Sequence, residues 1–465
     1  MYTNLEFSLN STLAVILLIF QRFSFRFRRL IGRSVDAPSY TEGVDLTGKI
    51  TVITGANAGI GRETAVKLVS CGATVVLGCR DIQKGIEAAQ QINNEISSLN
   101  PTIHPYAKNG KAIFMRLDLS DLSSVVEFSN KIKSDYPRVD ILINNAGVNM
   151  KGMLSTGLEQ LFQVNYLGHY LLIRCLQKHL CYYTDKDETN CPNVARIINL
   201  SSVMHHGGQP NFVASSTHSY TTLMAAKSSY YADSKLYMHY LTMEVNRRFD
   251  ISKSYSLTQS PNSYSSFDNE KGLGSQAHSI RPIVSLSVNP GAVRSDIWRD
   301  YPFQTIYNMI MKLIFLEVDE GCASSVYAAT VEMSIIRNYQ QNLIATKDIG
   351  GRFIKRPDVP YIVPYQVSSC SSTSSSSSCS TDGGCLAQEM LGVYEGCIFS
   401  GVSLPTHDEV ISSGLQDTSY GVTSSSTTMH PIIQATQLWK YSGDLCYKIL
   451  LKLGLPESEI KFLLE

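Results

Sequence analysis

The sequence lacks an excess of charge of either sign. Its 465 residues include 40 Lys and Arg against 40 Asp and Glu, so the formal net charge is zero. Proteins that bind nucleic acid through its phosphates carry clustered basic residues, and the candidate core sequence has no such stripe. We therefore expect no nucleic-acid partner. The 43% of hydrophobic residues suffices for a sizeable core, in one large domain with additions or in two to three domains.

Cysteine pairs with zinc spacing are also missing. None of the 11 cysteines forms a Cys-x-x-Cys pair, and we expect no metal site. Cys71, Cys79, Cys175 and Cys322 lie in apolar sequence, which is typical of reduced core residues in a protein that faces the cytosol. The cysteines within residues 370–397 lie in a Ser-rich segment, where we favour chance clustering over disulfides or a loose metal site.

A hydrophobic run long enough to span a bilayer is missing near the N-terminus. Residues 12–20 are apolar, but they are fewer than the roughly 17 residues that a membrane helix needs. Arginines follow this run, whereas a cleaved signal peptide has its positive charge before it. Two interpretations of residues 1–35 remain open: a marginal membrane anchor, or an Arg-rich organelle-targeting segment. We favour an anchor in the endoplasmic reticulum membrane with the rest of the chain in the cytosol, and keep the mitochondrion as the alternative.

From residue 46 onward the sequence alternates strand and helix patterns. Short apolar, β-branched runs predict strands at residues 49–53, 74–77, 112–117, 139–143, 196–200 and 283–288. Helical patterns lie between and after them at residues 62–71, 81–99, 120–133, 162–181, 231–249 and 320–337. This alternation predicts an α/β fold: a single Rossmann-type doubly wound parallel sheet with helices on both faces and ligands at the carboxyl ends of the strands.

The first predicted strand runs into a glycine-rich turn, Thr54-Gly-Ala-Asn-Ala-Gly-Ile-Gly61. Gly55 lets the chain turn tightly, Gly59 lets the backbone approach a pyrophosphate, and Gly61 allows close packing of helix on strand. The N-terminus of the following helix adds free N–H groups and a positive dipole. Because the glycines stand between a strand and a helix, the segment predicts a nucleotide-binding site.

The second predicted strand ends without a carboxylate. A carboxylate there would hold the adenosine ribose hydroxyls, but this sequence has Cys79 and Arg80. A neutral side chain followed by a guanidinium favours NADP(H) over NAD(H). The alternative is that Arg80 pairs only with Asp81 or with solvent. After the third strand, Asp118 can accept from the adenine amino group or cap the next helix.

Tyr231 and Lys235 stand four residues apart in a predicted helix, so their polar ends face the same side. A free phenol titrates near pH 10, which is about three units too high for proton transfer at neutral pH. A neighbouring ammonium favours the phenolate and makes such a tyrosine a usable acid or base. On an exposed helix the same spacing is usually a solvated surface, so the pair gains meaning only from the motifs upstream.

Taken together, five motifs resemble the short-chain dehydrogenase/reductase family. They are Thr54-Gly-x-x-x-Gly-Ile-Gly61, Asn144-Asn-Ala-Gly147, Asn165, Ser202 and Tyr231-x-x-x-Lys235. Finer detail resembles the retinol dehydrogenase branch: Leu77-Gly-Cys-Arg-Asp81, Asn165-Tyr-Leu-Gly-His169, Ser201-Ser-Val-Met-His-His206 and Pro290-Gly-Ala-Val-Arg-Ser295. The resemblance implies an NAD(P)-dependent oxidoreductase that transfers hydride between the nicotinamide and an alcohol or carbonyl.

The resemblance also implies roles for individual residues. Tyr231 would be the general acid/base, Ser202 would bind the substrate oxygen, Lys235 would bind the nicotinamide ribose, and Asn165 would hold a water in a proton relay. His205 and His206 would shape the pocket without reacting. The residues expected to bind cofactor are Gly55, Asn57, Gly59, Ile60, Gly61, Arg80, Asp118, Leu119, Asn145, Ala146, Gly147, Tyr231, Lys235, Pro290, Gly291, Val293 and Ser295.

Residues 301–316 are apolar and aromatic, and they follow the expected cofactor loop. In position they resemble the family's substrate lid, which predicts a lipophilic substrate. A retinol/retinal-like substrate is favoured, with a steroid, polyprenoid or other lipid carbonyl as the alternative. In a different class of function, a nucleotide-binding scaffold would act through its Ser-rich insertions. The family often dimerises, so a homodimer is an expectation.

The expected domain organisation has four parts. Residues 1–35 form the anchor or targeting segment, and residues 46–365 form the catalytic domain with a flexible insertion at about 250–281. A Ser/Thr-rich, low-complexity insertion covers residues 366–434 and is expected to be disordered. A C-terminal helix within residues 435–465 would pack back on the catalytic domain.

Overall fold

The computed structural model describes residues 41–183, 194–208, 230–249, 279–294, 315–332, 361–362, 398–400 and 431–464. Residues 1–35, most of both insertions and nearly all of the candidate lid lie outside them. So do Ser295 and the closing strand expected at residues 350–353. Within the described part of the chain, no helix is long and apolar enough to cross a membrane.

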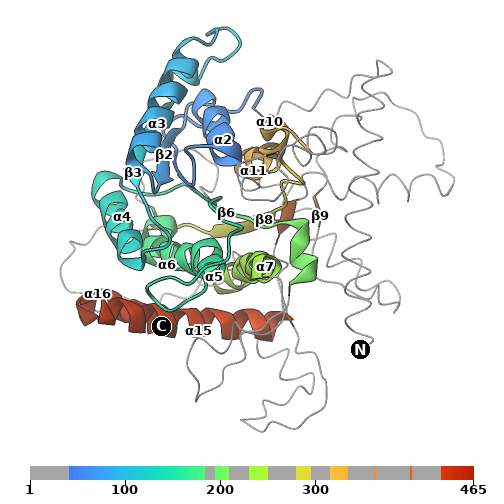
Figure 1. The fold of residues 1–465 in the computed structure, drawn as a ribbon. Helices are drawn as coiled ribbons and strands as arrows, with labels where there is room; N and C mark the ends of the chain where they lie inside the picture. Colours follow the sequence, from blue (N-terminus) through green and yellow to red (C-terminus); the bar gives the residue numbers. More distant parts are fainter. Residues whose placement is uncertain are drawn as a thin grey trace, which may run out of the picture.

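A central sheet of eight strands organises the described residues (Figure 1). Its order is β3-β2-β1-β4-β6-β8-β10-β9, and the first six strands are parallel. These six are β1 (Ile50–Thr54), β2 (Thr74–Cys79), β3 (Lys111–Arg116), β4 (Ile141–Asn144), β6 (Ala195–Leu200) and β8 (Ile283–Val288). The Rossmann-type sheet expected from the alternating pattern is confirmed. The strand order reverses between β1 and β4, which in such sheets marks the ligand-binding edge.

Two short strands continue the sheet in the antiparallel sense. They are β9 (Tyr361–Ile362) and β10 (Ile398–Ser400), and β10 pairs with β8. β10 falls inside the Ser/Thr-rich segment, most of which is outside the described residues. A separate antiparallel pair, β5 (Tyr182–Tyr183) with β7 (Ser279–Ile280), stands next to the start of β8. None of these four strands was expected from the sequence.

Helices cover both faces of the sheet (Figure 1). One face carries α2 (Gly59–Ser70), α3 (Ile82–Ser97), α10 (Val318–Gly321) and α11 (Ala323–Thr330). The other carries α4 (Leu122–Asp135), α5 (Gln160–Phe162), α6 (Gly168–Cys181) and α7 (Tyr230–Arg248). The short turns are η1 (Ala107–Asn109), the π-helical η2 (Gln163–Leu167), and η3 (Val203–Gly207). Two buried apolar clusters, one on each face, make the core.

The prediction of a single helix at residues 320–337 is wrong in its extent. The structure has two short helices divided at Cys322, and the second ends at Thr330 because Val331 leaves helical geometry. Arg196 of β6 donates to the carbonyls of Ala328 (2.9 Å) and Val331 (2.5 Å), which satisfies the end of α11. A guanidinium from a distant strand therefore ends this helix, and no local sequence signal marks the point.

A C-terminal helix, α15 (Pro431–Lys452), lies along the outside of α7, α4 and α6 (Figure 1). The chain then ends in α16 (Glu457–Ile460) and η6 (Lys461–Leu464). α15 buries an apolar face that includes Leu438, Trp439 and Leu450. The Tyr166 hydroxyl lies 2.8 Å from that of Ser442, and the ring of Trp439 packs edge-on against Tyr170 at 4.9 Å between centroids. α15 is thus a constituent of the main hydrophobic core.

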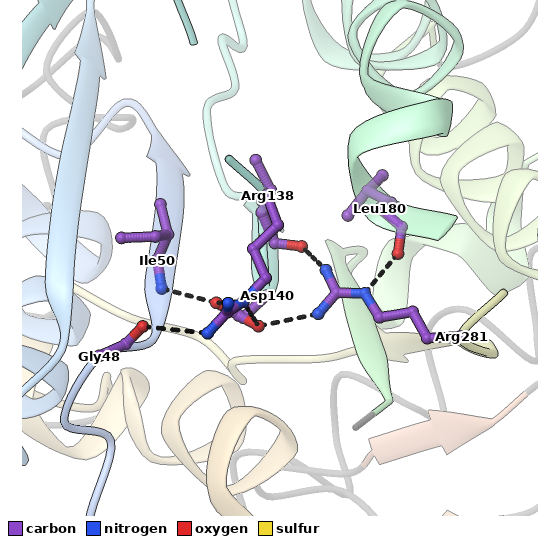
Figure 2. A network of polar contacts seen from close by, with 7 residues as sticks. Gly48, Ile50, Arg138, Asp140, Leu180 and Arg281 are labelled. Atoms are coloured by element: carbon purple, nitrogen blue, oxygen red, sulfur yellow. Dashed lines mark hydrogen bonds and ion pairs between the residues drawn. The ribbon is translucent and has the colours of Figure 1, made fainter. Parts of the chain in front are cut away.

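A buried ion-pair network joins the amino ends of three strands (Figure 2). Asp140, immediately before β4, accepts from the Ile50 backbone N–H at 2.8 Å, from Arg281 at 2.8 Å and from Arg138 at 3.1 Å. Arg281 also donates to the carbonyls of Leu180 and Val139. Asp140 and Arg281 are both nearly inaccessible to solvent. The network lies at the edge opposite the glycine turn, so we assign it to stability.

Substituting Asp140 by Ala should lower the free energy of unfolding by about 3–5 kcal/mol, because Arg281 would remain buried without its counter-ion. Urea denaturation measures this loss. The matched control is Asp135→Ala, which removes the exposed Lys131–Asp135 pair at 2.9 Å and should cost at most about 1 kcal/mol. Equal, small losses in both variants would contradict the assignment.

Candidate active site

The turn between β1 and α2 is a close-packed glycine cradle. Gly55 and Gly59 have φ angles of 65° and 58°, which favour glycine. A Cβ built on Gly61 would lie 2.4 Å from Asn145 Nδ2 and 2.5 Å from the Gly55 oxygen, so no larger residue fits without a shift. α2 begins at Gly59, and its N-cap, Ala58, makes no side-chain cap. The first N–H groups of α2 therefore have no side-chain acceptor at the N-cap, and the cradle fits a dinucleotide pyrophosphate.

Thr54 fastens the cradle to the loop after β4. Its hydroxyl oxygen accepts from the backbone N–H groups of Asn145 and Ala146, each at 2.9 Å. In return, the Asn145 side chain donates to the carbonyls of Thr54 (2.8 Å) and Gly55 (3.2 Å). The two loops at the point where the strand order reverses therefore hold one another in place.

Asn165 lies in the π-helical turn η2, which interrupts the helix between α5 and α6. Its side-chain oxygen accepts from Val148 N at 2.8 Å, and its amide donates to Val148 O (3.0 Å) and to the Ser234 hydroxyl (3.1 Å). Such one-turn π-bulges often occur at functional sites. The Asn165 side chain thus binds the β4 loop to α7, while its main-chain carbonyl accepts from the His169 ring at 3.0 Å and keeps a second lone pair for a water.

Lys235 is buried in α7 on the same side as Tyr231, which is half-buried. Its ammonium nitrogen donates to the Leu200 carbonyl at 3.0 Å and lies 5.6 Å from the centre of the Tyr231 ring. Burial lowers the pKa of Lys235 to about 8. A Cβ built on Gly147 would be 3.6 Å from the Lys235 nitrogen and 3.5 Å from Asn165 Oδ1, so these groups flank Gly147.

The two serines after β6 differ in their environment. Ser201 is buried and its hydroxyl donates to the Lys235 carbonyl at 2.9 Å. Ser202 is half-buried and caps η3, with its hydroxyl accepting from Met204 N at 3.3 Å. His205 places Nδ1 2.5 Å from the Ser202 carbonyl and stacks on His239 of α7. The structure thus separates a structural serine from one that is accessible, while the His206 side chain lies outside the described part.

At the second strand's end, Cys79 is buried and Arg80 is exposed. Burial raises the pKa of the Cys79 thiol to about 11, so this side chain is neutral at physiological pH. Asp81 caps α3 through Lys84 N at 3.0 Å and lies 3.8 Å from the Lys84 ammonium. The described residues show no Arg80–Asp81 ion pair, which leaves the guanidinium facing solvent beside the cradle.

The remaining expected cofactor residues lie along the same carboxyl edge. Asp118 accepts from the Ser120 N–H (2.9 Å) and hydroxyl (2.6 Å), and it does not cap α4, whose N-cap is Asp121. Gly291 has a φ of 78°, and its N–H donates to Asn289. Val293 is buried and bridges to Leu316. The other members, described in the same region, are Asn57, Ile60, Leu119 and Pro290.

Sequence reasoning missed two residues that hold this site together, Thr54 and His169. His169 is completely buried and contacts both Thr54 and the Asn165 carbonyl. Both residues stand inside quoted motifs, Thr54 at the head of the glycine turn and His169 at the end of Asn165-Tyr-Leu-Gly-His169. The sequence shows each residue in its motif, but it does not show that the two side chains, 115 residues apart in the chain, are in contact.

Comparison with known proteins identifies the class. The profile of the family described as short chain dehydrogenase matches residues 49–235. Retinol dehydrogenase 12 of Mus musculus is 32% identical over 295 residues, which cover 63% of this chain and 76% of that protein. Retinol dehydrogenase 13 of Homo sapiens is 40% identical over 207 residues, or 44% and 55% of the two chains. A solved structure, the Pseudomonas aeruginosa RhlG/NADP active-site complex, matches with 20% identity, 63% and 92% coverage and a TM-score of 0.39.

The chain belongs to the short-chain dehydrogenase family, and it is an NAD(P)-dependent dehydrogenase/reductase that acts on CH–OH groups. Within the family it lies in the retinol dehydrogenase-like branch.

Proposed function

We propose that this protein transfers hydride between NADP(H) and the alcohol or carbonyl group of a lipophilic molecule, retinol/retinal-like in kind. The observation that carries the proposal is the buried Lys235 beside Tyr231, next to the accessible Ser202 and the glycine cradle. Burying an ammonium in apolar surroundings costs stability, so its presence beside a phenol favours a chemical role. The similarity to retinol dehydrogenases supports the substrate class.

Each residue of the site would have a distinct role in this reaction. When bound, the nicotinamide supplies or accepts the hydride. Ser202 and Tyr231 would hydrogen-bond the substrate oxygen, and Tyr231 would give or take the proton. Lys235 would hold the ribose and favour the phenolate through its charge. The carbonyl of Asn165, with a water, would connect Lys235 to solvent.

The preference for NADP(H) rests on Arg80. Its guanidinium is exposed at the end of β2, where a 2′-phosphate would lie and where the neighbouring Cys79 offers no carboxylate to the ribose. Exchanging Arg80 for Asp should raise the Kd for NADPH by about 10- to 100-fold, because a charged hydrogen bond contributes about 1.5–3 kcal/mol. The Kd for NADH should stay equal or fall.

Fluorescence titration of the purified chain with NADPH and with NADH tests this preference. Lys131→Asp on α4 makes the same charge change on the surface and should alter neither Kd. Stronger NADH binding by the native chain would overturn the assignment of Arg80. Screening retinal, a ketosteroid and a polyprenal with NADPH then tests the substrate class, and turnover of only the last two would replace retinoids by the alternative lipids.

The attachment and organisation of the chain are further parts of the proposal. Residues 1–35 would attach the protein to the endoplasmic reticulum membrane with the catalytic domain in the cytosol. The order of an apolar run followed by arginines supports this orientation. Residues 46–365 and the C-terminal helix would form the catalytic unit, and a homodimer remains part of the proposal.

A further inference from the structure

His169 lies one helical turn after Asn165 and has no exposed surface. Its Nε2 is 2.9 Å from the Thr54 hydroxyl oxygen, and its Nδ1 is 3.0 Å from the Asn165 carbonyl oxygen. The imidazole therefore bridges the end of β1, under the cradle, and the π-helical turn beside Lys235.

Counting protons determines the direction of both bonds. The Thr54 oxygen already accepts two backbone N–H groups, so its own proton points at His169 and Nε2 is the acceptor. Nδ1 then carries the ring proton and donates it to the Asn165 carbonyl. Burial, together with the nearby charge of Lys235, lowers the pKa of His169 to about 4. His169 is thus neutral at physiological pH and held in one tautomer.

The connection continues into the helix of Tyr231. Asn165 donates to the Ser234 hydroxyl at 3.1 Å, and Ser234 donates to the Tyr231 carbonyl at 2.8 Å. Hydrogen bonds therefore link Thr54 to His169 and His169 to the Asn165 carbonyl, and from the side chain of the same Asn165 they continue through Ser234 to the backbone of Tyr231. These hydrogen bonds connect the cofactor loops with the helix that carries the proposed acid/base, Tyr231.

We propose that His169 is a positioning residue for the dehydrogenase reaction. Through its bonds to Thr54 and to the Asn165 carbonyl, His169 holds the cofactor loops and the Tyr231–Lys235 helix at a fixed separation. The proposal rests on the proposed function of this site. Its two bonds have separate consequences. The bond to Thr54 supports cofactor binding, and the bond to Asn165 supports turnover because it holds the carbonyl that faces the relay.

Three substitutions separate the two bonds. In His169→Asn the amide nitrogen stands near the position of Nδ1, so the bond to Asn165 is kept and that to Thr54 is lost. In His169→Gln the longer amide reaches Thr54 and the Nδ1 donor is lost. We expect His169→Asn to raise the Kd for NADPH about 3- to 10-fold with kcat within about threefold, and His169→Gln to do the reverse, lowering kcat about 10-fold or more. His169→Phe should show both defects.

Measurements made without substrate test the role of His169 independently of the proposed substrate class. Imidazole ¹⁵N NMR should show the Nδ1–H tautomer of His169 between pH 8 and 5. The Lys235 pKa, followed by ¹³C NMR of its ε-carbon, should shift by at least about half a unit in His169→Phe and His169→Gln but not in His169→Asn.

The outcomes then decide between the hypotheses. A charged His169, or an Nε2–H tautomer, overturns the proposal, as do native kcat, Kd and Lys235 pKa in both amide variants after correction for folded fraction. If the native chain turns over no tested carbonyl while the NMR results and the NADPH affinities follow the expected pattern, the positioning role stands and the proposed substrate class fails. If His169→Phe does not fold, the two amide variants carry the test by themselves.

Discussion

Replacing Tyr231 by Phe should lower kcat by about 10²- to 10⁴-fold while the Kd for NADPH stays within about threefold. The substitution removes only the phenolic oxygen, which would hydrogen-bond the reacting oxygen and exchange its proton. The ring would remain beside the Lys235 ammonium, 5.6 Å from its centre in the native chain. Steady-state kinetics with a lipophilic aldehyde and NADPH, together with fluorescence titration, measure both quantities.

A second phenol on the same helix supplies the control. The Tyr240 hydroxyl donates to Gln434 of α15 at 2.5 Å, away from the cradle. Tyr240→Phe should cost about 1 kcal/mol of stability and leave kcat within about twofold. A fully active Tyr231→Phe enzyme would exclude Tyr231 as the acid/base. Loss of NADPH binding along with kcat would mean that the substitution damages the site as a whole.

Substituting Lys235 by Met should lower kcat by at least about 100-fold. The same substitution should nevertheless stabilise the protein at pH 7. Lowering a lysine pKa from 10.5 to about 8 means that the folded chain pays up to about 3 kcal/mol to keep the ammonium buried. Methionine has similar length and no charge, but it leaves the Leu200 carbonyl without its donor, at about 1 kcal/mol or more. We expect a net gain of about 1–2 kcal/mol.

The gain should depend on pH in a defined direction. Below the folded-state pKa, both the folded and the unfolded chain carry the ammonium, and the full cost of burial is present. As pH rises from 8 toward 10.5 the folded chain loses its proton first, so the cost falls and the advantage of Lys235→Met disappears. Urea unfolding of both proteins at pH 7 and pH 9.5 measures this difference. A variant that is less stable than the native chain at pH 7 would contradict the assigned cause of the pKa shift.

Much of the fold could be predicted because its signals are local. The strand from Ile283 to Val288 was expected at its observed bounds, and the other parallel strands were expected within about two residues, since β-branched runs end at glycine or polar turns. The glycine turn before α2 likewise follows from a motif with a mechanical reason. Tyr231, Lys235 and Ser202 were expected to share one site, and the structure packs the loop that carries Ser201 and Ser202 against the helix that carries Tyr231 and Lys235.

The rest depends on contacts between distant residues. Arg196 ends α11 more than 130 residues away, so a helix predicted from its own sequence extends too far. β10 exists as the partner of β8, in a Ser/Thr-rich segment whose composition predicts no strand, and β9 exists as the partner of β10. The bridge from Thr54 through His169 to Asn165 is likewise a product of the folded chain. A sequence shows such residues as candidates, but only the fold decides which of them touch.

The place of α15 has a consequence for how this protein is made. Trp439, Leu445 and Leu450 complete the hydrophobic core over α6 and α7, yet β8 already ends at Val288. On a ribosome that adds about 5–20 residues per second, the roughly 140 residues between them take on the order of ten seconds to synthesise. During that interval the side of α4, α6 and α7 on which α15 packs lacks this partner helix. The proposed catalytic residues are all synthesised by Lys235, but this core stays incomplete until α15 is made. A chaperone would therefore matter most during this interval.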